Sequence, residues 1–139
     1  MSYEEKGAWV YLTVVIGAYG GYLAVLIDRL GSTPVSEVPF VGTLLWSLGI
    51  SIGLSIVGRI AVEIAKPSDS YRVDARDREI NRLGERVGGG VLAAAMIVPF
   101  GLSLADADNF WVANAIYAAF VLSALVSTPV KLIAYRQGM

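Results

Sequence analysis

The stretch GAWVYLTVVIGAYGGYLAVLI, from Gly7 to Ile27, contains no charged residue and decides the class of the protein. A helix crosses the hydrocarbon core of a bilayer with about 20 mostly apolar residues. Asp28 and Arg29 end the stretch, and the residues from Gly31 to Pro34 follow as a turn. A soluble helix would need a polar face, which this stretch lacks. We therefore predict a membrane-spanning helix over about 7–27.

Three further stretches fit the same description, over about 40–65, 87–105 and 110–130. The chain has 139 residues, of which 55% are hydrophobic and only 17% are charged, and its mean hydropathy is +0.61. A soluble bundle of these helices would have too little polar surface to cover them. The sequence predicts an all-α membrane protein, a single-domain bundle of four transmembrane helices, with a charged loop over 66–86.

The basic residues predict the orientation of the four spans. Lys and Arg gather on the cytoplasmic side of membrane proteins. Of the 11 Lys and Arg residues, all except Arg29 lie on the side that holds both termini and the 66–86 loop. We therefore expect a multi-pass protein of the cell membrane, with both termini and this loop in the cytoplasm.

The composition also excludes several kinds of chemistry. The chain has no Cys and no His, which removes disulfides, thiolate and imidazole metal sites and nucleophilic catalysis that depends on Cys or His. We predict no cofactor, no metal site and no enzymatic activity. A net charge of −1 argues against nucleic-acid binding. The acidic start MSYEEKGAW does not resemble a cleaved signal peptide.

Small residues predict where the helices meet, because close approach of backbones drives helix association in a bilayer. Small residues recur at spacing four in several spans, as Gly17/Gly21, Gly49/Gly53 and Gly84/Gly88. We expect these faces to make contacts mainly within one chain, and a homodimer is the alternative.

Three polar residues within or near the spans are candidates for an intramembrane site: Arg59, Glu63 and Asn114. Arg59 and Glu63 are four residues apart, so they share a helix face and can pair. Such a pair is either a binding or relay site, or a structural pair at the cytoplasmic interface, and we favour the structural interpretation. For Asn114 we expect an interhelical hydrogen bond.

The loop over 66–86 is the most densely charged part of the chain, with 11 of its 23 charged residues. We expect a helix that begins near Ser70 or Asp74 and runs through Arg86 into the third span, with Ile80, Leu83 and Val87 as a narrow apolar strip that could lie on the membrane. Five of its residues are candidates for contact with a cytoplasmic protein, a lipid headgroup or a second copy of the chain: Asp74, Arg76, Asp77, Arg78 and Arg82. The other interpretation, which we favour for this segment, is a topological anchor that folds against the bundle and pairs Asp77 with Arg82 or Arg59.

The pattern Asp74-x-Arg76-Asp77-x-x-Ile80-x-x-x-Gly84 resembles a segment of a group of uncharacterised small bacterial membrane proteins with four spans. In those proteins the segment lies between the second and third spans, as it does here. Many members carry Glu where this chain has Ala75, so its acidic cluster is smaller. The resemblance covers nearly the whole chain. It implies the architecture and a bacterial inner membrane, but no activity.

The sequence thus favours a non-enzymatic accessory or regulatory membrane protein that acts through its charged cytoplasmic segment. Membrane lipids are its expected surroundings, and a cytoplasmic protein or a second copy is a candidate partner. The alternative is a small oligomeric transporter or channel, with Arg59, Glu63 and Asn114 lining a shared path. A lipid enzyme, in which carboxylates would serve as acid or base, is the least favoured.

Overall fold

The computed structural model describes residues 3–32, 34, 39–65 and 75–137. Its helices are α1 (Tyr3–Leu30), α2 (Val41–Ala65), α3 (Ala75–Ala95), α4 (Ile97–Leu104) and α5 (Asn109–Arg136). α3 and α4 follow one another as a single span, so the described residues contain four segments long and apolar enough to cross a membrane. The predicted all-α, four-span architecture is confirmed. Asp74, Lys66 and Arg72 lie outside the described residues.

Most helix ends differ from the predicted spans because helices continue beyond the hydrocarbon core. α1 begins at Tyr3 and includes the charged residues that we expected before the span. α3 begins at Ala75 and runs into the third span without a break, as predicted. The helix is interrupted at Met96, three residues before Pro99, because proline removes an N–H and crowds the preceding turn. Asp108 is the N-cap residue of α5 but makes no side-chain capping bond.

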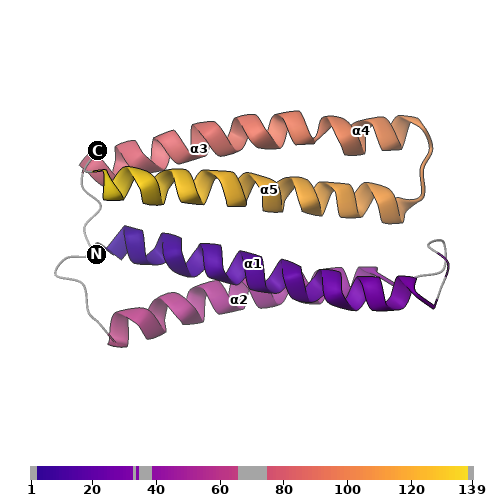
Figure 1. Ribbon diagram of the computed structural model, residues 1–139, viewed down its shortest axis with the longest axis horizontal. Helices are drawn as coiled ribbons and strands as arrows, with labels where there is room; N and C mark the ends of the chain where they lie inside the picture. Colours follow the sequence, from indigo (N-terminus) through magenta and orange to yellow (C-terminus); the bar gives the residue numbers. More distant parts are fainter. Residues whose placement is uncertain (1–2, 33, 35–38, 66–74, 138–139) are drawn as a thin grey trace.

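The helices pack in the order α3, α5, α1, α2, with α4 continuing α3 along α5 (Figure 1). The start of α1, the end of α2, the start of α3 and the end of α5 all lie at one end of the molecule, which we call the charged end. α2 packs chiefly against α1 and stands at the edge of this row. At the opposite end, Arg29 Nη1 donates to the carbonyl oxygen of Pro39 and to Thr43 Oγ1, both at 2.6 Å, and so ties α1 to α2.

Two clusters of buried side chains form the core. The larger lies between α1 and α5 and contains Val15, Tyr22, Leu26, Phe110, Tyr117, Val121 and Ala124. The smaller lies between α3 and α5 at the charged end and contains Ile80, Ala134 and Tyr135. In α2 only Ser47 is buried.

Only some of the predicted small-residue faces meet another helix. A Cβ atom on Gly88 would lie 2.8 Å from Ser127 Cβ, and one on Gly84 would overlap the side chain of Lys131. A Cβ on Gly17, Gly21, Gly49 or Gly53 would meet nothing within 4 Å among the described residues. For these two pairs the expected contact within the chain is wrong, since the row of helices leaves their faces open. A homodimer through them stays a prediction.

Candidate functional site

The first turns of α3 are fastened to the end of α5. Asp77 is 4% exposed, and its Oδ1 accepts a 2.7 Å hydrogen bond from the Tyr135 hydroxyl. Arg76 Nη2 donates at 2.6 Å to the backbone carbonyl of Tyr135, and its guanidinium lies 5.4 Å from the centre of that ring. Two of the five candidate residues of the charged segment therefore hold α3 against α5. For Asp77 this geometry favours the anchoring interpretation, with Tyr135 in place of the expected Arg82 or Arg59.

The same face of α3 continues the contact along the helix. Ile80 is fully buried among Ala134 and Tyr135, and Gly84 leaves room for the aliphatic stem of Lys131. Residues three and seven positions apart lie on one helix face, so Asp77, Ile80 and Gly84 form one contact surface. The expected placement of the apolar strip on the membrane surface is wrong for Ile80, because α5 covers that residue.

The opposite face of α3 carries a column of arginines at spacing four: Arg78, Arg82 and Arg86. All three are exposed, and none forms an ion pair among the described residues. Like charges at this spacing mildly destabilise a helix. The column is therefore a set of exposed cations held side by side, with the exposed carboxylates of Glu79 and Glu85 next to it on the same helix. The structure brings Arg78 and Arg82 to this surface and turns Asp77 away from it.

Arg59 and Glu63, both on α2, do not pair with each other in the described residues. Glu63 Oε1 lies 3.3 Å from Lys6 Nζ, and Arg59 Nη2 lies 3.3 Å from Glu4 Oε1. Both partners are on α1. The two ion pairs thus cross from α2 to α1 at the charged end, in place of the predicted pair along one helix. Lys6 and Glu63 are largely buried, which increases the importance of their pairing.

The guanidinium of Arg59 lies on the surface of α1 beside Gly7. A Cβ at Gly7 would be 2.7 Å from Arg59 Cζ, so a larger residue there would require the Arg59 side chain to shift. The Tyr3 ring contacts the cation from one side, with 4.1 Å between Cζ and the ring centre. Arg59 Nε is buried and has no hydrogen-bond partner among the described residues. The chain therefore positions this cation closely but leaves part of its hydrogen-bonding capacity unused.

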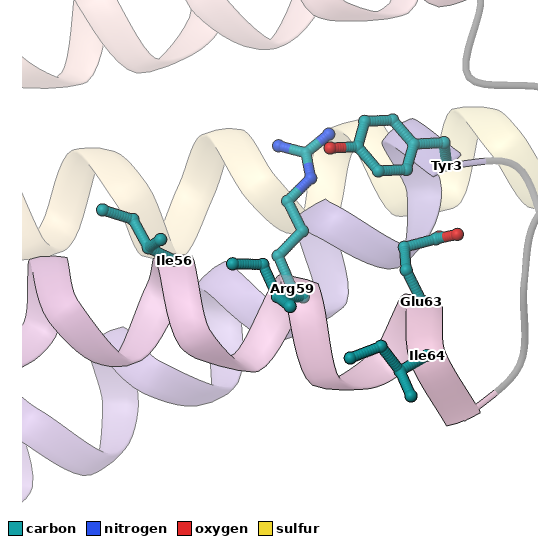
Figure 2. Close-up of a pocket in the computed structure, with 6 residues that line it drawn as sticks. Tyr3, Ile56, Arg59, Glu63 and Ile64 are labelled. Carbon is teal, nitrogen blue, oxygen red and sulfur yellow. The ribbon is translucent and has the colours of Figure 1, made fainter.

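A hollow of about 490 Å³ opens beside this cation, and we call it the Arg59 hollow. Figure 2 shows the side chains that line it, with the tips of Arg59 and Tyr3 next to each other and Glu63 one helical turn further along α2. The complete lining is Tyr3, Ile56, Arg59, Ile60, Glu63 and Ile64. The hollow thus combines both signs of charge with three isoleucines.

A longer groove of about 740 Å³ runs between α2 and α5 over α1, and we call it the α2–α5 groove. It shares Ile56 with the Arg59 hollow, so the two spaces adjoin. Its lining is mostly aliphatic and aromatic, and its polar side chains are Tyr11, Ser51, Ser55 and Tyr117. An apolar groove of this kind suits a hydrocarbon chain better than an ion.

Asn114 makes the expected interhelical hydrogen bond. Its Oδ1 accepts from the Tyr22 hydroxyl, and its Nδ2 donates to the Phe110 carbonyl at 2.8 Å. Ser47 and Tyr117 share a further hydrogen bond of 2.6 Å between α2 and α5. These polar contacts lie in the core beside the tyrosine rings and link three helices. They place Asn114 far from Arg59 and Glu63, so the three candidate intramembrane residues do not gather into one site.

Comparison with known protein families, curated proteins and solved structures gives no match. The residues that sequence reasoning missed are the partners from α1 and α5: Glu4, Lys6, Gly7 and Tyr135. The spacing of Asp77, Ile80 and Gly84 on one face could have indicated a contact surface. No feature of the sequence indicated which residue of α5 would meet it.

Proposed function

We propose that this chain is a non-enzymatic accessory protein of a bacterial inner membrane, and that the exposed arginine column of α3 binds an acidic surface of a cytoplasmic protein. In this proposal the charged end faces the cytoplasm, as the distribution of Lys and Arg favours. The observation that carries the proposal is the column itself: Arg78, Arg82 and Arg86 are exposed and form no ion pair among the described residues.

The height of the column above the membrane favours a protein over lipid headgroups. From Val87 to Leu104 the third span rises about 26 Å, close to the roughly 30 Å of a hydrocarbon core. Arg78 lies nine residues before Val87, which corresponds to about 13 Å beyond the core. The headgroup layer is only about 5–8 Å deep on each side. Arg86 therefore lies among headgroups, whereas Arg78 extends into the aqueous phase.

The fastening of α3 to α5 supports a regulatory role. The start of α3 is packed against α5 through Asp77, Ile80 and Gly84. This packing holds the arginines on the opposite face of α3 in place. α3 is continuous from the column to Ala95, so a partner bound at Arg78 is joined to the membrane span by one helix. Binding of a partner to this column would therefore respond to movements of the span, because both belong to the same helix.

The proposal is tested with a photo-crosslinking residue at Glu79, which is exposed between the arginines. We expect a protein adduct in intact cells, and an at least roughly tenfold weaker adduct in the double variant Arg78→Glu/Arg82→Glu, because charge reversal turns attraction into repulsion. The matched control is Arg136→Glu, an exposed arginine at the same end on α5, which should leave the adduct intact. An adduct only with lipid, or one that survives the double reversal, would refute the proposal.

Orientation has its own test. The chain has no Cys, so single cysteines can be introduced cleanly. A cysteine at Ser32 should react with a membrane-impermeant maleimide in intact spheroplasts, and one at Gln137 should react only after lysis. The reverse pattern would put the arginine column outside the cell and exclude a cytoplasmic partner.

A further inference from the structure

We propose that the Arg59 hollow and the α2–α5 groove together bind one phospholipid with an ethanolamine headgroup. Its phosphate would contact Arg59, its ammonium group Glu63, and one acyl chain would occupy the groove. This site lies on the α1–α2 side of the molecule and is separate from the arginine column of α3.

The first support is the unused capacity of Arg59. A guanidinium has five N–H donors, and only one contact to a carboxylate, the 3.3 Å contact with Glu4, is present in the described residues. Its side chain is 35% exposed, so the cation remains accessible from the hollow although Nε is covered. Arginine binds phosphate oxygens through paired N–H bonds. The Tyr3 ring lies against the cation and limits its movement before binding, which reduces the entropy lost on binding.

The second support is the depth of the groove. Arg59 and Leu48 are eleven residues apart on α2, which is about 16 Å along the helix. Half of a hydrocarbon core is about 15 Å. If the phosphate contacts Arg59, the acyl chain can therefore run along the groove for about the depth of one leaflet. The shared residue Ile56 joins the headgroup space to the chain space.

The third support is the sign of the charges, which selects the headgroup. Glu63 lines the hollow, and Glu4 lies beside the guanidinium. The two carboxylates are balanced by the cations of Lys6 and Arg59, so these four side chains offer no net attraction to a headgroup with a net negative charge. An ammonium group is attracted to the carboxylates, and a carboxylate that already contacts Lys6 can accept further hydrogen bonds. The arrangement fits a zwitterion with a small primary ammonium better than an anionic lipid.

The fourth support is access from the bilayer. Ile52, Ile60 and Ile64 along this side of α2 each expose more than half of their surface. α2 stands at the edge of the row of helices, so a lipid can enter sideways without any helix moving. A soluble phosphate would gain nothing from the groove, and this makes the acyl chain part of the recognition.

The test uses delipidated full-length protein and native mass spectrometry. The protein is offered an equimolar mixture of phosphatidylethanolamine, phosphatidylglycerol and phosphatidylcholine with identical acyl chains. We expect preferential retention of one phosphatidylethanolamine. Arg59→Gln should weaken that retention roughly tenfold or more, because it removes charge-assisted hydrogen bonds. Arg82→Gln is the matched control and should have no effect, since Arg82 lies on α3.

The acyl-chain part is tested with a matched pair on α2. Ile52 lines the groove, whereas Ile50 is exposed and lines neither space. Ile52→Trp should crowd the groove and weaken retention, and Ile50→Trp should leave it unchanged. If Arg59→Gln fails to fold, Arg59→Lys tests the same contact, because it keeps the charge but loses the paired geometry and should bind with intermediate strength.

Three outcomes would overturn the proposal. Equal retention of the three lipids would remove the headgroup site, and preference for phosphatidylglycerol would contradict the role of Glu63. Equal thermal protection by glycerophosphoethanolamine, which has no acyl chains, would remove the groove from the site. The double variant Arg78→Glu/Arg82→Glu should retain the lipid as the wild type does, so failure here and failure of the protein-docking proposal are distinguishable.

Discussion

The two helix pairs of this protein pack in opposite ways. α3 and α5 approach closely enough that side chains at Gly84 and Gly88 would overlap the partner helix, and they enclose a fully buried Ile80. α2 and α1 are joined by ion pairs and by a few hydrogen bonds, with one close approach at Gly58, and only Ser47 of α2 is buried. Both pairs contain glycines at spacing four. The difference shows that small residues permit close packing but do not cause it.

The largest effect should come from removing the buried side chain that seals α3 to α5. Ile80→Ala should cost about 2–5 kcal/mol of unfolding free energy, because it leaves a cavity at a fully buried position. Ile64→Ala on α2 is the matched control, since Ile64 is 77% exposed, and should change stability by about 0.5 kcal/mol or less. Unfolding in detergent micelles by added dodecyl sulfate measures both. Equal losses would mean that the two pairs are not packed differently.

An intermediate effect is expected from adding bulk where the backbones meet. Gly88→Leu should destabilise the protein by about 1–3 kcal/mol, because the new side chain would collide with Ser127. Its neighbour Gly89 has open space around it, so Gly89→Leu should be neutral or slightly stabilising through its better helix propensity. Melting temperatures of the two variants under the same conditions decide the point. A destabilised Gly89→Leu would indicate a contact, such as a second copy, on the outer face of α3.

The smallest effect should come from the polar link between α2 and α5. Ser47→Ala removes the hydrogen bond to Tyr117, and hydrogen bonds between membrane helices contribute about 0.6 kcal/mol on average. A double-mutant cycle with Tyr117→Phe isolates the coupling from other effects of each change. A coupling well above about 2 kcal/mol would mean that α2 is held in place far more firmly than its open packing suggests.

The sequence predicted the spans because the rule behind them is local. A charge-free stretch such as 7–27 is a helix in the bilayer whatever its neighbours do, and α3 was predicted to run unbroken from the charged segment. Pairings between helices were not predictable in the same way. Glu63 lies four residues from Arg59 in the sequence, yet its described partner is Lys6 on α1, and the partner of Asp77 is Tyr135 on α5. Spacing defines which residues share a face, and it carries no information on the helix that faces them.

The bond between Tyr22 and Asn114 sets a condition on biosynthesis, because its two residues are 92 positions apart. At a synthesis rate of about 5–20 residues per second, Asn114 emerges roughly 5–20 s after Tyr22. During that interval α1 is completed and α2 and α3 are made, but α5, which covers Val15, Tyr22 and Leu26, is not. The first hairpin must therefore wait in the translocation machinery or the bilayer with its tyrosine hydroxyl bound to some other acceptor. Of the described helices, α5 is the last to be synthesised, and it completes the core.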